Sequence, residues 1–123
     1  MAYRLSIKFK DENRPDFYTP VSAQRNWQEH WRPIIEAHKL DLLWYAGAEI
    51  LFINRDEDGR HPLTVETLTQ LEHELDVMQI AFEARTDFDP ASLTYNLENI
   101  KRVREAISIA KQDIDAVERF YIG

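Results

Sequence analysis

The sequence predicts an α+β fold, a ferredoxin-like βαββαβ antiparallel sheet with an added long C-terminal helix. Segments in which apolar and polar residues alternate with period two are separated by segments with helical spacing. A strand at 77–84 would give every predicted strand a partner, which favours this order over the alternative, a three-stranded sheet packed on three helices. The chain has 123 residues, so 1–123 is expected to form a single α+β domain.

The first forty residues predict a strand, a loop and a helix. Apolar residues alternate with polar ones at the start, as in a half-buried strand: Tyr3, Leu5, Ile7 and Phe9. Prolines at positions 15 and 20 predict a loop over 11–21. Ser22 is expected to cap a helix that Pro33 kinks or restarts. Trp27 and Trp31 lie one turn apart on it and are interpreted as core residues, with an exposed contact patch as the alternative.

The middle of the chain predicts a hairpin and a second helix. Residues 42–45 and 49–53 are β-prone, and Gly47 between them suits a tight turn. Residues 54–62 are expected to form a charged loop, after which Thr64 caps a helix with Leu68, Leu71 and Leu75 on one face. Residues 77–84 fit either a strand or the continuation of that helix, and pairing of the sheet favours the strand.

The last segment carries the most regular helical signal. Asp89 followed by Pro90 is a typical helix start, and apolar residues then recur every three or four positions as far as Tyr121. We therefore predict a helix over about 91–119. The apolar face of this helix is expected to cover the sheet, and a homodimer through the C-terminal helix is the alternative.

Acidic residues are concentrated in one part of the sequence. The chain has a net charge of −7, and residues 41–89 hold 12 acidic and 3 basic groups. A solubilising surface is one interpretation, and a docking surface for a basic protein is the other. The residues that would form such a partner-binding surface are Asp56, Glu57, Asp58, Glu66, Glu72, Glu74 and Asp76.

Sequence motifs for catalysis, metals and cofactors are not found. The chain has no cysteine, and its three glycines form neither a P-loop nor a GxGxxG motif. The loop that starts at Asn54 resembles a calcium loop over half its length, but Val65 stands where the bidentate glutamate belongs. The four histidines lack metal-ligand spacing. We expect no catalytic residue, metal or cofactor.

The profile of the chain is that of a small acidic binding protein. It resembles bacterial toxin immunity proteins and related nuclease inhibitors in size, charge and lack of cysteine, and that resemblance implies occlusion of a basic, nuclease-type partner. The alternative is a small dimeric ferredoxin-like enzyme or ligand-binding protein, with a pocket lined by Tyr3, Trp44, Tyr45 and Phe52 and with His30 or His38 as acid or base. The acidic charge disfavours nucleic acid and membranes as partners, and the N-terminus lacks a signal peptide, so a cytoplasmic location is expected.

Overall fold

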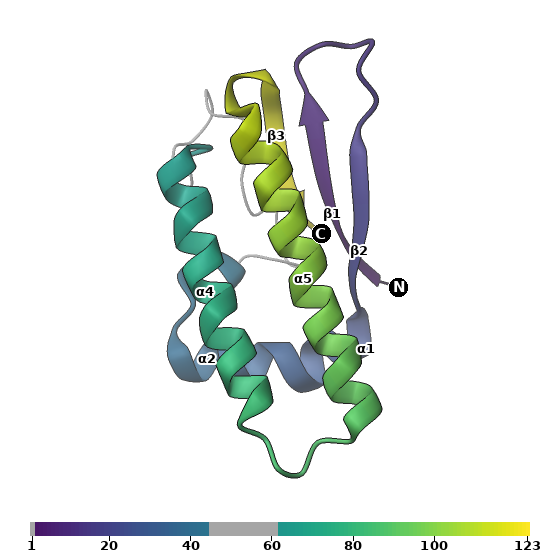
Figure 1. Cartoon of the computed structure of the whole chain (residues 1–123), viewed down its shortest axis with the longest axis vertical. Coiled ribbons are helices and arrows are strands. Elements are labelled where there is room, and N and C mark those ends of the chain that lie inside the picture. Colours follow the sequence, from purple (N-terminus) through teal and green to yellow (C-terminus); the bar gives the residue numbers. More distant parts are fainter. Residues whose placement is uncertain (1, 45–61) are drawn as a thin grey trace.

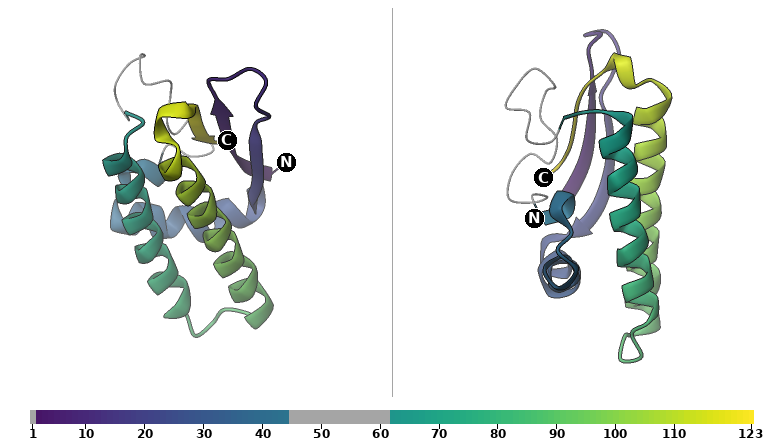
Figure 2. Two further views of the ribbon diagram at one scale, coloured as in Figure 1. Left: turned by 45° about the horizontal axis from the view of Figure 1, so that its top comes forward. Right: turned by 90° about the vertical axis from the view of Figure 1, so that its left-hand side faces the viewer.

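The computed structural model describes residues 2–44 and 62–123. In these residues, strands β1 (Ala2–Phe9), β2 (Phe17–Ala23) and β3 (Val117–Ile122) form one antiparallel sheet of order β2-β1-β3. Helices α4 (Val65–Glu83) and α5 (Pro90–Gln112) lie side by side and cover one face of the sheet (Figures 1 and 2). The α+β class is therefore confirmed.

Strand β2 corrects the predicted loop over 11–21. Pro20 does not prevent a strand because β2 lies at the edge of the sheet, where a residue without an N–H leaves no second neighbour unpaired. The register pairs Leu5 with Thr19 and Arg4 with Pro20, and it shifts between Tyr3 and Arg4. A proline is thus a poor indicator of a loop when the sheet position of the segment is not known.

The first helical segment runs without interruption through α1 (Gln24–Asn26), η1 (Trp27–Trp31) and α2 (Arg32–His38). Ala23 precedes it, so Ser22 is not the cap, and its hydroxyl instead donates to the Ala23 carbonyl. η1 is a π-helical turn in which the Arg32 N–H donates to the Trp27 carbonyl. Pro33 is therefore the second residue of α2, directly after the π-helical turn, and the chain passes it without the predicted restart of the helix at Pro33.

Residues 41–44 form helix α3 (Asp41–Trp44), which corrects the predicted strand at 42–45 over residues 42–44, the part of it that the structure describes. Its Leu42 and Leu43 are both buried in the core. The remainder of the predicted hairpin (46–53) and the charged loop over 54–61 lie outside the described residues. The cap on α4 is confirmed, because the Thr64 hydroxyl accepts a hydrogen bond from the Thr67 N–H at 3.1 Å.

Residues 77–84 belong to helix α4 and its C-terminal cap, so the predicted strand is wrong. The helical interpretation holds, because one continuous buried stripe faces α5 and the sheet: Leu68, Leu71, Leu75, Met78 and Phe82. Pairing of the sheet favours a strand here, but the chain completes the sheet with β2 and β3 instead. The local pattern fits both structures, so the error comes from the assumed sheet topology.

Helix α5 starts at Pro90 as predicted but ends at Gln112, and not at about 119. A 3₁₀ turn, η2 (Ile114–Ala116), follows it and leads into β3. Phe120 and Ile122 are buried and alternate with partly exposed residues, which is the period of a strand. Because two strands come first and one comes last, the ferredoxin-like order is wrong.

The alternative prediction is closer to the structure. The described residues hold the three strands it named, with four helical segments rather than three: the continuous segment over 24–38, then α3, α4 and α5. The core lies between the sheet and the α4–α5 pair, and the segment over 24–38 crosses its lower end (Figure 1). Within the described ranges, no helix is both long enough and apolar enough to cross a bilayer.

Candidate functional site

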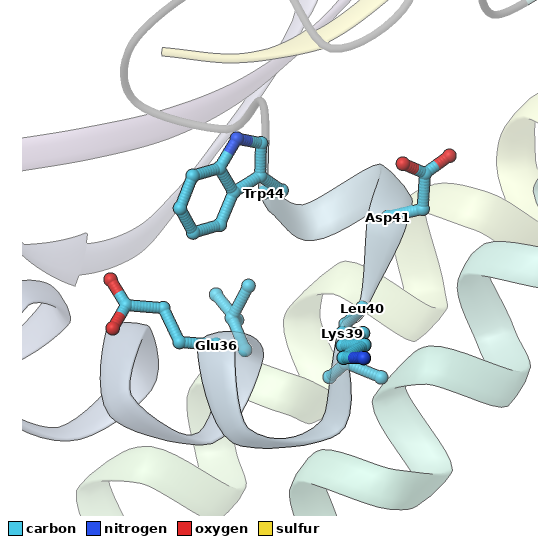
Figure 3. A pocket seen from close by; sticks show the side chains of 6 residues that line it. Glu36, Lys39, Leu40, Asp41 and Trp44 are labelled. Atoms are coloured by element: carbon cyan, nitrogen blue, oxygen red, sulfur yellow. The ribbon is translucent and has the colours of Figure 1, made fainter.

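An open groove of about 650 Å³ lies between α2 and α3 (Figure 3). Its lining combines apolar and charged side chains: Ile35, Glu36, Lys39, Leu40, Asp41 and Trp44. Ile35 and Leu40 are buried, whereas the Trp44 side chain is 46% exposed. The groove therefore offers an exposed indole above an apolar floor, with charged groups at the rim.

A tight turn brings the two walls of the groove together. Lys39 adopts a left-handed conformation with φ of 54°, directly after α2. The Leu40 N–H donates to the Ile35 carbonyl at 3.0 Å, and the Lys39 N–H donates to the Glu36 carbonyl at 3.4 Å. This is the Schellman pattern of a helix end, and it reverses the chain so that α3 begins two residues later.

Glu74 on α4 holds α3 in place. Its side chain is only 7% exposed, and its two carboxylate oxygens accept the N–H groups of Leu42 and Leu43 at 3.1 and 2.9 Å. Burial raises the pKa of this carboxyl, although the two backbone hydrogen bonds act in the opposite direction. The predicted docking residue Glu74 is therefore an internal anchor that positions Asp41 and Trp44.

The other predicted docking residues do not form one free acidic surface. The Glu72 carboxylate pairs with Lys111 of α5, and Asp76 pairs with Arg104 of α5 at 2.6 Å. Glu66 is exposed in the first turn of α4. Asp56, Glu57 and Asp58 lie outside the described residues. The carboxylates that the structure does bring to the groove are those of Glu36 and Asp41, which sequence reasoning missed.

Trp27 and Trp31 belong to the core, which settles the alternative left open by the sequence. Their rings stack with centroids 4.7 Å apart, and both side chains are fully buried. The Trp31 indole N–H donates to the Asn96 side-chain oxygen at 2.8 Å. These two tryptophans are therefore not available as interface anchors, and Trp44 is the exposed tryptophan.

Of the four residues expected to line an enzyme pocket, the structure describes Tyr3 and Trp44, and these two do not share a groove. Tyr3 is buried against Trp27, with ring centroids 5.0 Å apart, and it does not reach the groove of Trp44. The His30 ring packs on Phe88 and lies 3.3 Å from an Arg85 nitrogen. Tyr45 and Phe52 lie outside the described residues. In the part of the chain that the structure describes, no three histidine or carboxylate side chains are grouped as metal ligands.

The groove has the chemistry to receive a cationic side chain. The Arg32 guanidinium already lies 5.5 Å from the Trp44 ring centroid, so the indole face accepts a cation in this structure. In Figure 3 the Glu36 carboxylate lies below the indole and supplies an acceptor for N–H donors, whereas the Asp41 carboxylate lies at the other end of α3 and points away from the ring. A guanidinium of a partner could therefore stack on the ring and bond a carboxylate in one step.

Comparisons with protein-family models, with curated proteins and with solved structures find no match to this chain. The fold class is α+β. The proposal for the function therefore rests on the chemistry of the surface residues.

Proposed function

We propose that this protein is a cytoplasmic binding protein that occludes a basic partner, in the manner of a bacterial toxin immunity protein, and that it is not an enzyme. The observation that carries the proposal is the exposed Trp44 in a groove with two carboxylates. Tryptophan is among the residues that most often dominate binding energy at interfaces. Here it stands in a groove of the size that an arginine or lysine side chain with its neighbours would fill.

The charge of the whole chain supports a cationic partner. In the groove itself, the carboxylates of Glu36 and Asp41 are balanced by the Lys39 ammonium and by the Arg32 guanidinium beside Trp44, but a net charge of −7 for the whole chain places a negative field around it. Such a field raises the rate of encounter with a basic protein. The predicted docking residues Asp56, Glu57 and Asp58 lie outside the described residues, so the proposal rests on the groove.

The anchor formed by Glu74 supports a preformed site. Hydrogen bonds from α3 to a buried carboxylate of α4 fix the position of the Trp44 helix before a partner arrives. A site that is already ordered loses less conformational entropy on binding, and this favours affinity.

Capture from the source cell tests the proposal. The immobilised protein is incubated with lysate at 50 and 500 mM salt, and the captured proteins are identified. Each captured protein is then purified and added to this protein while the intrinsic tryptophan fluorescence is recorded. We expect a partner with basic pI, with an affinity that falls as salt rises. Because Trp27 and Trp31 are buried, the fluorescence change should come from Trp44.

Three variants decide whether the groove is the site. Trp44→Ala, and the double variant Glu36→Lys with Asp41→Lys, should each lower the affinity at least tenfold. Glu83→Lys, on an exposed residue at the far end of α4, is the matched control and should leave it nearly unchanged. Binding that survives both groove variants, or a captured partner without basic character, would show that the proposal is wrong.

A second candidate is a protein that binds a small molecule in the same groove. The volume of about 650 Å³ falls in the range of ligand sites, and the lining is mixed in polarity. A cationic metabolite with an aromatic or guanidinium group would fit the same side chains. Thermal shift measurements against such compounds distinguish it from the first candidate, because only a small-molecule site would be saturated by them at micromolar concentration.

A further inference from the structure

The sheet face that points away from α4 and α5 carries a row of two tyrosines. Ser6 of the central strand β1 is paired with Tyr18 on one side and with Tyr121 on the other. Residues directly opposite each other on neighbouring strands point to the same face, so these three side chains form one line across the sheet. Tyr18 is 55% exposed, Tyr121 is partly exposed, and Ser6 is buried between them.

Basic side chains surround this row. Lys8 is paired with Arg119 in the register, so both lie on the tyrosine face on one side of the row. Arg4 lies on the other side, and its guanidinium is 5.7 Å from the Tyr18 ring centroid. Two acidic groups approach this face: Glu118, at a bulge in β3, lies 3.5 Å from the Lys8 ammonium, and the Asp16 carboxylate accepts a hydrogen bond from the Tyr18 hydroxyl at 3.1 Å.

The two faces of the sheet differ in kind. Helices α4 and α5 cover one face of the sheet (Figure 2). Leu5, Ile7 and Phe120, which alternate with the residues of the tyrosine face, are fully buried. On the other face, Arg4, Lys8 and Tyr18 are exposed to solvent. The exposed side chains of this face, Arg4, Lys8 and Tyr18, do not contribute to the buried core.

We propose that this outer face, defined by Arg4, Ser6, Lys8, Tyr18, Arg119 and Tyr121, binds a single-stranded nucleic acid. Aromatic rings on an open sheet are stacking platforms for unpaired bases, and arginine and lysine beside them contact the phosphates. The strand spacing places the tyrosine backbones about 10 Å apart, so two bases of one strand can each meet a ring. An acidic peptide would use the cations but would leave the ring faces without a matching group.

The proposal departs from the expectation drawn from net charge. At 0.1 M salt the screening length is about 10 Å, so a phosphate on this face interacts mainly with the cations next to it. The remaining negative charge of the chain lowers the affinity, and binding should be weak and strongly dependent on salt. This surface shares no residue with the Trp44 groove, so the proposal is independent of the proposed protein partner.

The probe is a fluorescein-labelled ten-nucleotide oligouridine, with oligothymidine of equal length as the DNA form, followed by anisotropy from 25 to 200 mM salt. With three cations engaged, the logarithm of the association constant should fall with a slope of about −2 against the logarithm of salt. Arg4→Gln or Arg119→Gln should each reduce that slope by about 0.7. Lys101→Gln on the exposed side of α5 is the matched control and should not change it.

Aromatic variants separate stacking from charge. Tyr18→Ala and Tyr121→Ala should each weaken binding at least fivefold, whereas Tyr18→Phe and Tyr121→Phe keep the ring and should bind nearly as well as the parent. Circular dichroism checks that each variant is folded. No change in anisotropy at 25 mM salt, equal binding by the alanine variants, or equal affinity for polyglutamate of matched charge would each overturn the proposal.

Discussion

In helix α4 a run of negative charge is evident in the sequence but mostly paired or buried in the structure. On the outer sheet face the positive charge is present in the structure but not evident in the sequence. Helix α4 has five carboxylates and no lysine or arginine, which made it the clearest charged segment of the sequence. In the structure, Glu74 is buried and Glu72 and Asp76 pair with α5. The outer sheet face gathers its cations from β1 and β3, and no single stretch of sequence reveals it.

Charged side chains that follow one another in the sequence can be paired or buried within the folded protein, and they are then not free to bind a partner. A helix with one apolar stripe places its flanking positions against the neighbouring helix, where cations of α5 can reach them. Strands present every second residue to solvent, so short basic segments that are far apart in sequence can combine on one face.

The largest effect is expected from removal of the Glu74 anchor. Glu74→Ala leaves the N–H groups of Leu42 and Leu43 without their acceptors in a buried place. We expect the free energy of unfolding to fall by about 2 kcal/mol, because two buried N–H groups then lack a hydrogen-bond acceptor and are no longer compensated for their removal from water. Urea unfolding followed by circular dichroism measures it.

The matched control for this prediction is Glu66→Ala on the same helix. Glu66 is exposed in the first turn, where its carboxylate gains only from the helix dipole, so the loss should stay below about 0.5 kcal/mol. Similar losses for Glu66 and Glu74 would mean that Glu74 is not an anchor and that α4 carries only surface charge.

The second prediction concerns pH. Burial raises the pKa of Glu74 in the folded protein, and the nearby Asp41 carboxylate adds to that rise. The folded state therefore binds this proton at pH values where the unfolded chain has released it, and stability from this residue falls as pH rises above the ordinary glutamate pKa of about 4.3.

Comparison with Glu74→Gln isolates that effect. The parent should lose stability relative to Glu74→Gln as the pH is raised from about 4.5 to 7, while other carboxyl groups cancel in the difference. Thermal melts of both proteins at several pH values provide the measurement. A difference that grows in the opposite direction would mean that the pKa of Glu74 is lowered by its hydrogen bonds.

Much of the helical layer could be predicted from the sequence, because its signals are local. The Thr64 cap, the start of α5 at Pro90 and the stripe of Leu68, Leu71 and Leu75 all report on neighbouring residues, whereas the strand predicted at 77–84 rested on sheet pairing and was wrong. Strand β2 could not be recognised in the same way. Pro20 is excluded from a central strand but accepted at an edge, and only the complete sheet shows where an edge lies.

The candidate site was less predictable than the fold. Trp44 was recognised as an aromatic candidate, but its partners Glu36 and Asp41 belong to a groove created by the turn at Lys39. The left-handed conformation of a lysine has no sequence signal, because glycine or asparagine is usual at such a position. Long-range pairing likewise decided which carboxylates of α4 stay free.

The third prediction concerns the two cations of α5 that pair with carboxylates of α4. Lys111→Met and Arg104→Met each remove the partner of a carboxylate, and each should lower the free energy of unfolding by about 0.5–1 kcal/mol. The double variant should also unfold less readily as salt rises, because the freed carboxylates repel one another. Urea unfolding at 50 and 500 mM salt measures both effects, and Lys101→Met is the control on an exposed position of α5.

Variants that keep the parent's stability at both salt concentrations would show that these pairs do not bind α4 to α5.

The smallest effect is expected at Tyr18, where one acidic group meets the basic face. The Tyr18 hydroxyl donates a hydrogen bond to the Asp16 carboxylate at 3.1 Å, and this bond together with the negative charge of Asp16 raises the pKa of the phenol above its ordinary value. Asp16→Asn removes the charge, so the pKa should return toward the usual range, and Arg4 then favours the phenolate. Carbon NMR of the tyrosine ring, with Tyr18→Phe to assign the signal, follows the titration. An unchanged pKa in Asp16→Asn would mean that Asp16 leaves this face uncoupled, and the outer sheet face would then be more basic than the contacts of Tyr18 indicate.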